Sequence, residues 1–198
     1  APGGIEIDPT RIGVAAPNPA LAIRPYPSSW DMHVRLDGLG VTLRPIRPED
    51  AELYPRFLER MDPEDMRLRF LVPTRTLSPE TMVRLTQLDY DRDIAFVALD
   101  EPSGELAGIV RYSADPDRMR AEYGVLVRSD LKGHGLGRLM MERLIDYARS
   151  ENIGELFGLV LRENEAMLTL CTDLGFSVTG GGDDPTLVRV TLSLNPAG

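Results

Sequence analysis

The sequence predicts an α/β (α+β) protein with a mixed, mostly antiparallel central sheet of roughly six to seven strands, flanked by about four helices. Two observations lead to this prediction. In the middle of the 198-residue chain, short apolar or alternating runs follow one another with turn residues between them, as in antiparallel hairpins. Beyond them, helical and strand patterns alternate, and a strand–helix–strand unit requires a crossover that places parallel strands in the sheet.

Residues 1–30 are rich in proline and show little periodicity, so we expect an extended arm or linker before a single domain over residues 31–198. This start lacks the apolar stretch of a signal peptide. Cys171 is the only cysteine, so no internal disulfide can form. No apolar run is long enough to cross a bilayer. We therefore expect a cytoplasmic protein without a membrane partner.

The first half of the domain combines a hairpin with helices. The run "MHVRLDGLGVTLRPI" contains two alternating stretches around Asp37-Gly38, which is typical of a hairpin turn. Pro48 is followed by Glu49 and Asp50, which suit the first turn of a helix over "EDAELYPRFLER", although Pro55 interrupts that pattern. A second helix is expected over "SPETMVRLTQL", with Ser78 as its N-cap.

The second half supplies most of the sheet. The runs "IAFVAL" and "LAGIVRYS" flank a turn with Pro and Gly, so they should pair as an antiparallel hairpin. The expected order is strands at 94–99, 106–113 and 117–127, a helix from about Leu136 to about Ser150, a strand at 155–161, a helix closed by Gly175, and a strand at 186–194.

Glycines stand directly in front of a helical pattern in "LKGHGLGRLMMERL". A strand, a glycine loop and a helix N-terminus together bind phosphate groups, because the first helical amides have no internal partners and the helix dipole adds positive charge. Lys132, His134 and Arg138 add donors or charge in an otherwise acidic chain. Neither the Walker nor the Rossmann pattern fits. Taken alone, the glycines favour a tight turn without a ligand.

The stretch Lys132-Gly133-His134-Gly135-Leu136-Gly137 resembles the Gln/Arg-x-x-Gly-x-Gly/Ala signature of the GCN5-related N-acetyltransferases (GNAT), and the order of elements over residues 33–198 is similar to the GNAT fold. The stretches "LRPIRPEDAELY", "LTQLDYDRDIAFVA" and "AEYGVLVRSDLKGHGLGRLM" are similar to the acetyltransferase domain of bacterial Pat-type protein lysine acetyltransferases. Such domains are often fused to a domain resembling an acyl-CoA synthetase, and "LAIRPYP" is similar to the junction in those fusions.

This resemblance implies acetyl-CoA as the cosubstrate. The loop amides would hold its pyrophosphate, the backbone of the preceding strand would hold the pantetheine arm and the acetyl carbonyl, and Asn164 would contact the arm. The coenzyme-binding residues that it implies are Val125, Leu126, Val127, Lys132, Gly133, His134, Gly135, Leu136, Gly137, Arg138 and Asn164.

Glu122, in "AEYGVLV", is the expected general base. Acetyl transfer to an amine requires the neutral amine, whereas a free lysine has a pKa of roughly 10.4. A carboxylate can take the proton directly or through water. Pat-type enzymes carry their catalytic Glu in this motif, and an exposed strand Glu without a catalytic role is the alternative. If Glu122 is not the base, Asp89, Asp91 and Asp93 are the next candidates.

Cys171 stands where many members of the superfamily have a tyrosine that acts as an acid. Its place in an apolar stripe with Met167, Leu170 and Leu174 indicates packing instead. No His/Cys cluster has metal-ligand spacing, so no metal is expected.

The formal net charge of −9 lacks the basic character typical of nucleic-acid binding, so no nucleic-acid partner is expected. Acid gathers in residues 47–65, either as a solvated face or as a docking surface for a basic partner. These features predict an acetyl-CoA-dependent N-acetyltransferase that modifies the ε-amine of a lysine on a protein, such as an acyl-CoA synthetase. The alternatives are a small-molecule amine N-acetyltransferase and a non-catalytic acyl-CoA-sensing module of a larger protein.

Overall fold

The computed structural model describes residues 24–70, 88 and 91–195. These residues form an eight-stranded sheet in the order β1-β2-β3-β4-β5-β6-β8-β7. All neighbouring strands are antiparallel except β5 and β6, which are parallel. The expected mixed, mostly antiparallel sheet is confirmed. Its strands are β1 (Met32–Leu36), β2 (Leu39–Pro45), β3 (Asp93–Asp100), β4 (Leu106–Ala114), β5 (Arg120–Val127), β6 (Glu155–Leu161), β7 (Ser177–Gly180) and β8 (Leu187–Ser193).

The sheet has one strand more than the range expected from the sequence. The additional strand is β7, a four-residue edge strand whose residues are all exposed. It therefore lacks the alternation of buried and exposed residues by which a strand is recognised in a sequence.

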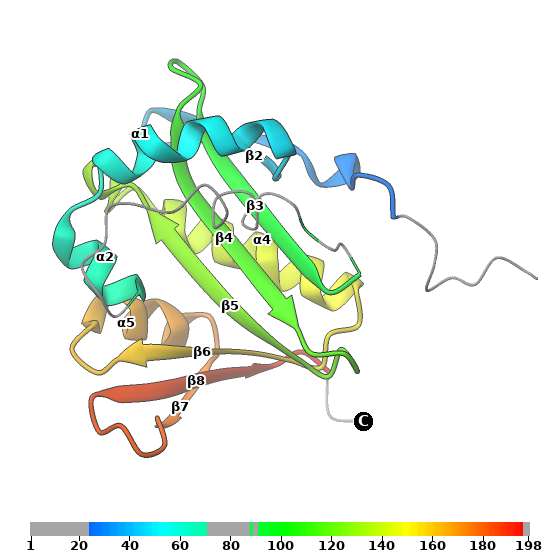
Figure 1. The fold of residues 1–198 in the computed structure, drawn as a ribbon, viewed down its shortest axis with the longest axis vertical. Coiled ribbons are helices and arrows are strands. Elements are labelled where there is room, and N and C mark those ends of the chain that lie inside the picture. The colour runs from blue at the N-terminus through cyan, green and yellow to red at the C-terminus, as the bar shows by residue number, and fades with distance from the viewer. Residues whose placement is uncertain (1–23, 71–87, 89–90, 196–198) are drawn as a thin grey trace, which may run out of the picture.

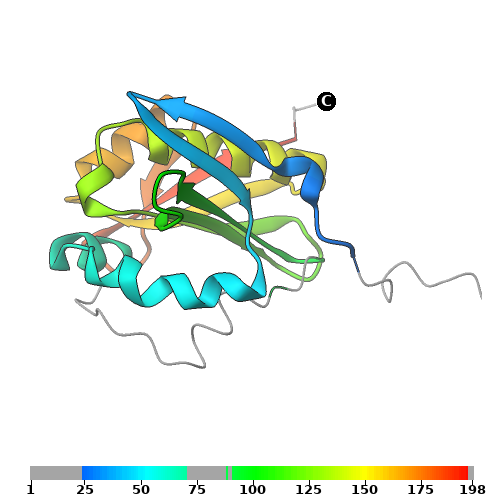
Figure 2. The same cartoon turned by 90° about the horizontal axis from the view of Figure 1, so that it is seen from above.

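Helices cover both faces of the sheet (Figures 1 and 2). On one face lie α4 (Leu136–Ser150) and α5 (Glu165–Asp173), and on the other lie α1 (Tyr54–Glu59) and α2 (Pro63–Phe70). The described residues also include three short 3-10 turns: η3 (Ser28–Trp30), η4 (Pro48–Leu53) and η5 (Ser129–Leu131).

The helices after β2 differ from the expected arrangement. In place of one helix interrupted by Pro55, the 3-10 turn η4 ends at Leu53 and α1 begins at Tyr54, so Pro55 falls in the first turn of α1, where its missing N–H costs nothing. The sequence pattern did not predict α2, half of whose residues are charged. The helix expected at Ser78 lies outside the described residues.

Two hydrophobic clusters hold the helices to the sheet. The larger one, which includes Phe96, Met140 and Leu144, lies on the α4 face, and the smaller one, which includes Phe57 and Val97, lies on the α1 face. Tyr26, close to the start of the described residues, also packs on the domain, since its hydroxyl donates to the Pro45 carbonyl at 2.8 Å. The boundary expected at residue 30 stays a prediction.

The parallel pair β5 and β6 separates along its length. Their register runs only from Arg120–Glu155 to Glu122–Phe157, although β5 continues to Val127 and β6 to Leu161. Beyond these pairs the two strands diverge (Figure 1). The divergence leaves a gap in the sheet directly before the glycine loop and the N-terminus of α4.

Candidate active site

The glycine loop places the uncapped N-terminus of α4 at this gap. Gly133 and Gly135 take the left-handed backbone conformation, with φ of 85° and 81°, which favours glycine. Gly135 is the N-cap of α4, and no side chain caps this helix end. The first amides of α4 are therefore available to an anion, and the helix dipole favours one there.

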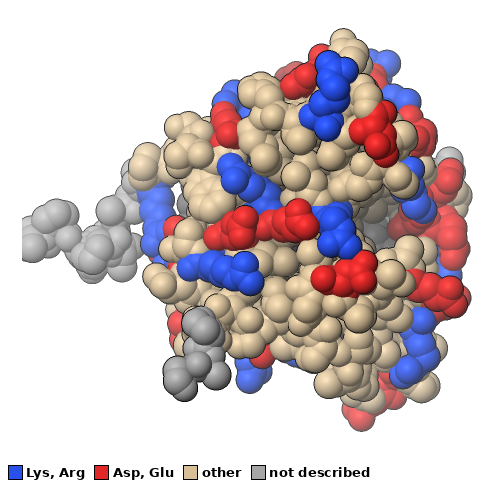
Figure 3. All heavy atoms as spheres, turned by 180° about the vertical axis from the view of Figure 1, so that it is seen from behind, with Lys and Arg blue, Asp and Glu red and all other residues tan. Residues whose placement is uncertain are grey.

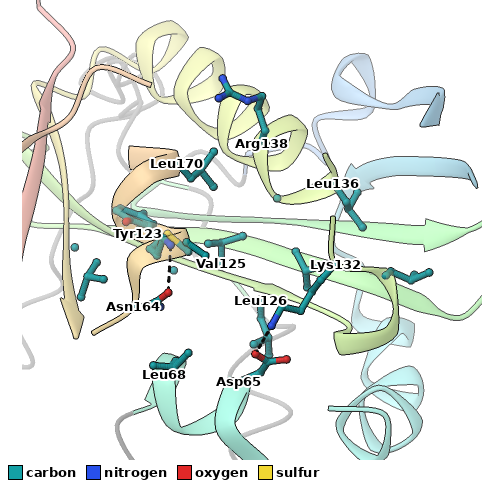
Figure 4. Close-up of a pocket in the computed structure, with 18 of the residues that line it drawn as sticks. Asp65, Leu68, Tyr123, Val125, Leu126, Lys132, Leu136, Arg138, Asn164 and Leu170 are labelled. Carbon is teal, nitrogen blue, oxygen red and sulfur yellow. Dashed lines mark hydrogen bonds and ion pairs between the residues drawn. The ribbon is translucent and has the colours of Figure 1, made fainter. Parts of the chain in front are cut away.

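A pocket of about 400 Å³ joins the loop, the divergent strands and helices α2 and α5 (Figure 4). Every residue expected to bind the coenzyme lines it except His134. The Nδ1 atom of His134 is buried without a hydrogen-bond partner among the described residues. Further lining residues that the sequence did not suggest are Asp65 and Leu68 from α2, Tyr123 and Gly124 from β5, Leu131, Gly158, Leu159 and Val160 from β6, and Ala166, Met167 and Leu170 from α5.

Hydrogen-bond alternation along β5 decides which of its backbone groups face the gap. Arg128 donates its N–H to the Ala107 carbonyl at 2.8 Å, and hydrogen-bonded pairs alternate along an antiparallel ladder. Leu126 therefore bonds to β4, whereas Val125 and Val127 direct their N–H and C=O groups toward the β6 side. Of the three residues expected to offer backbone groups, Val125 and Val127 therefore direct theirs into the gap, while Leu126 contributes its side chain to the pocket wall (Figure 4).

The cations around the loop are held by carboxylates. Lys132 Nζ lies 2.5 Å from Asp65 Oδ1, so α2 contacts the loop directly (Figure 4). Arg138 lies 2.8 Å from Asp173 of α5. Both cations are exposed enough to exchange these partners for a phosphate.

Arg128 has a structural role instead. The residue is only 2% exposed, and its guanidinium pairs with Asp130 at 2.7 Å and with Asp100 and Glu105 at longer range. These ion pairs hold the start of the loop against the turn that joins β3 and β4.

Asn164 joins the pocket to α5. Its side-chain oxygen accepts the N–H of Met167 at 3.1 Å and caps the helix, as the dashed line in Figure 4 shows. With the oxygen used in the cap, the amide nitrogen is the atom that can donate to a ligand in the pocket.

Glu122 lies beside the pocket rather than in its wall. Its side chain is exposed and faces the α1–α2 side of the sheet, between Ser113 of β4 and Phe157 of β6 in the register. Gly124, two residues along on the same face, lines the pocket. Glu122 is thus positioned to meet a molecule that approaches from this face.

Cys171 is fully buried in the larger core, as expected of a packing residue. Burial raises the pKa of its thiol, while a hydrogen bond to Tyr123 opposes that rise. The Tyr123 hydroxyl lies 3.0 Å from Cys171 Sγ.

The acidic segment 47–65 is partly neutralised within the fold. Asp50 is buried and forms a bidentate pair with Arg44 at 2.7 and 2.8 Å. Glu64 pairs with Arg67, and Asp65 pairs with Lys132. The segment is therefore a weaker docking surface than its sequence suggests. Figure 3 shows the opposite face of the molecule, the α4 side, where acidic and basic side chains are interspersed.

Within the described ranges, no helix is long and apolar enough to cross a membrane. The same part of the chain contains no group of three or more His, Cys, Asp or Glu that could hold a metal ion.

Comparisons with known proteins agree with the geometry of the pocket. Residues 41–177 match the family described as Acetyltransferase (GNAT) domain. The chain is 37% identical over 160 residues to Acetyltransferase PA5475 of Pseudomonas aeruginosa, an alignment that covers 80% of this chain and 86% of that protein. It is 30% identical over 148 residues to spermidine N(1)-acetyltransferase of Escherichia coli, covering 71% and 74% of the two chains.

Among solved structures, the GNAT domain of S. lividans PAT superposes with a TM-score of 0.79 at 28% identity. The superposition covers 85% of this chain and 99% of that domain. The fold expected from the sequence is confirmed, and the chain belongs to the GNAT acetyltransferase family.

Proposed function

We propose that this chain transfers the acetyl group of acetyl-CoA to the ε-amine of a lysine on a protein. The observation that carries the proposal is the pocket itself. At one end it has an uncapped helix N-terminus suited to a pyrophosphate, and at the other it reaches the part of β5 that bears Glu122.

The coenzyme would lie along the unpaired part of β5. Its pyrophosphate would accept hydrogen bonds from the first amides of α4, with Lys132 and Arg138 beside it. Its pantetheine amides would pair with the backbone of Val125 and Val127 in the way that a neighbouring strand does. The amide nitrogen of Asn164 would donate to the same arm.

The chemistry uses the face on which Glu122 lies. Glu122 takes a proton from the acceptor ammonium, directly or through water, and the neutral amine attacks the thioester carbon. Negative charge then develops on the carbonyl oxygen, and a backbone N–H of β5 directed into the gap, such as that of Val125, can stabilise it. The carbon–sulfur bond breaks, CoA leaves as the thiolate, and the nitrogen, now part of an amide, loses its second proton to water.

Two observations support a protein lysine as the acceptor. The resemblance of "AEYGVLVRSDLKGHGLGRLM" to the Pat-type enzymes includes the candidate base, and the superposition on the S. lividans PAT domain covers nearly all of that domain. We propose an acyl-CoA synthetase as the protein substrate, and an acyl-CoA-synthetase-like domain as the fusion partner in a longer chain. Both proposals rest on the resemblance alone.

A second candidate is a small-molecule amine. The relative named spermidine N(1)-acetyltransferase aligns with 71% of this chain, and the neutralised acid of residues 47–65 removes part of the argument for a basic protein partner. The exposed position of Glu122 is compatible with either acceptor.

A panel of acceptors separates these functions. Wild type and Glu122→Gln are incubated with acetyl-CoA and either a purified acyl-CoA synthetase, lysine peptides, spermidine or free amino acids. Mass spectrometry then identifies the acetylated product, and the release of the CoA thiol measures turnover. We expect lysine acetylation of the protein by wild type and not by the variant. Turnover with small amines alone would exclude the protein-lysine proposal. Tight coenzyme binding without turnover on any acceptor would indicate an acyl-CoA sensor instead.

A further inference from the structure

Tyr123 is a pocket residue to which the chemistry above gives no role. It follows Glu122 on β5, and successive strand side chains point to opposite faces of a sheet. Tyr123 therefore lies on the α4–α5 face, where it lines the pocket with only 8% of its surface exposed. Its hydroxyl reaches Cys171 of α5 at 3.0 Å.

The neighbours of the Tyr123 ring fix its position. A Cβ atom at Gly158 of β6 would lie 2.6 Å from Cε1 and 3.0 Å from Cζ of the ring, so any side chain at this position would displace it. On another side, the ring of Phe176 packs edge-on with a centroid distance of 5.6 Å. The absence of a side chain at Gly158 thus allows the phenol to occupy the wall of the pocket.

The place of the reaction follows from Glu122. The acceptor amine must lie near this carboxylate, on the α1–α2 face, and the thioester carbon must lie within bonding distance of the amine. The coenzyme enters from the loop at the other end of β5, along the unpaired edge. Its sulfur therefore arrives at the Tyr123 end of the pocket, on the side of the sheet opposite to the attacking amine.

We propose that the Tyr123 hydroxyl donates a hydrogen bond to the CoA sulfur as it leaves, and that Cys171 orients this hydroxyl. The carbon–nitrogen bond forms, the carbon–sulfur bond breaks, and the electron pair of the broken bond departs on sulfur. The phenol keeps its proton, because phenols are weaker acids than thiols, and the thiolate later takes a proton from water. Tyr123 thus stabilises the leaving group without becoming charged.

Cys171 acts here as a positioning residue. Its burial raises the thiol pKa, so the thiol keeps its proton at neutral pH. The S–H group can then donate to the phenol oxygen across the 3.0 Å contact. In that arrangement the contact with Cys171 does not use the hydroxyl proton of Tyr123, which can then be donated to the CoA sulfur.

The proposal rests on the acetyl-CoA function proposed above, and a binding experiment separates the two. Calorimetry measures the Kd of CoA and of desulfo-CoA, which lacks the sulfur, between pH 7 and pH 9.5. In wild type, CoA should bind more tightly as its thiol ionises near pH 8.5, because the thiolate is the better acceptor, whereas desulfo-CoA should show no such gain. In Tyr123→Phe the gain should fall by roughly tenfold, with desulfo-CoA affinity unchanged.

Matched variants distinguish a catalytic role from packing. Tyr112→Phe removes another buried phenol from the same face, on β4 opposite Tyr123, without touching the pocket, and should bind both ligands as wild type does. Cys171→Ser keeps a donor and should retain the pH-dependent gain, whereas Cys171→Ala should lose part of it. Equal weakening of both ligands in Tyr123→Phe would assign Tyr123 to packing, and an unchanged pH dependence would overturn the proposal. Failure of CoA to bind wild type at all would instead contradict the proposed function.

Discussion

The two faces of β5 have opposite characters. On the α4–α5 face, Tyr123 and Val125 are buried, and the pocket wall is completed by a loop whose glycines set the backbone path. On the α1–α2 face, Glu122 is exposed, and α2 borders the pocket with Asp65 and Leu68. The first, which we call the closed face, is suited to holding one ligand through backbone groups. The second, which we call the open face, is accessible to a molecule that approaches the sheet from that side.

The largest effect should come from the open face. Glu122→Gln keeps the shape of the side chain but cannot accept a proton as a carboxylate does. Acetyl-CoA affinity should be unchanged, while turnover should fall by roughly 10²–10⁴-fold, the usual contribution of a general base. The loss should shrink as pH rises toward the lysine pKa of roughly 10.4, because more of the amine is already neutral.

Steady-state rates and calorimetry on the same preparation measure both quantities. Glu49→Gln removes another exposed carboxylate, before α1, and should leave both unchanged. Near-normal turnover in Glu122→Gln at neutral pH would remove Glu122 as the base and make Asp91 and Asp93 the next residues to test.

A smaller effect should come from the closed face, through the loop backbone. Gly135→Ala forces a residue with a Cβ into the left-handed conformation, which costs about 1–2 kcal/mol. Acetyl-CoA binding should weaken about tenfold when measured by calorimetry, since the loop must keep this conformation to present its amides.

Gly137→Ala sharpens that result. Gly137 lies inside α4, and an added Cβ would meet Val127 and Leu170 at 3.6 and 3.8 Å, which are ordinary contacts. The free protein should therefore be as stable as wild type, and any loss of acetyl-CoA affinity would indicate that a phosphate occupies that space. Unchanged acetyl-CoA affinity in both glycine variants would show that the loop serves only as a turn.

The ion pair between Lys132 of the loop and Asp65 of α2 links the two faces, and its loss should have a smaller effect on acetyl-CoA binding. Lys132→Ala removes a cation that Asp65 of α2 now holds, so acetyl-CoA binding should weaken only a few-fold and become less sensitive to salt. Arg149→Ala, in the last turn of α4, removes an exposed cation away from the pocket and is the matched control. Identical salt dependence in wild type and Lys132→Ala would show that Lys132 does not contact the phosphates.

The smallest effect is expected at Cys171. Cys171→Ser places a hydroxyl in the core, so thermal melting should show a modest loss of stability from burying it, while most turnover remains. Loss of turnover in a variant that still melts like wild type would assign Cys171 a direct part in the chemistry.

The closed face could be predicted from the sequence because its signals are local. The glycine spacing marked the loop, the apolar stripe marked α5 with Cys171 inside it, and residues 155–161 formed β6 as expected. All expected coenzyme-binding residues except His134 then met in one pocket. These patterns depend on backbone conformation and burial, which neighbouring residues largely determine.

The features that could not be predicted depend on contacts between residues that are distant in the sequence. The pair of Asp65 and Lys132 joins residues 67 positions apart, and that of Tyr123 and Cys171 joins residues 48 apart. Neither has a local signal, and the short, charged α2 lacks the apolar periodicity that identifies a helix. Adjacency to Glu122 was the one sequence clue to Tyr123.

A crystal structure of the complex with CoA tests the central claim most directly. The account predicts the pyrophosphate on the first amides of α4, the pantetheine arm paired with the backbone of Val125 and Val127 between β5 and β6, and the sulfur within hydrogen-bonding distance of the Tyr123 hydroxyl. Glu122 should face the thioester position from the other side of the sheet. A coenzyme bound away from the gap between β5 and β6, or with its sulfur remote from both Glu122 and Tyr123, would contradict the account.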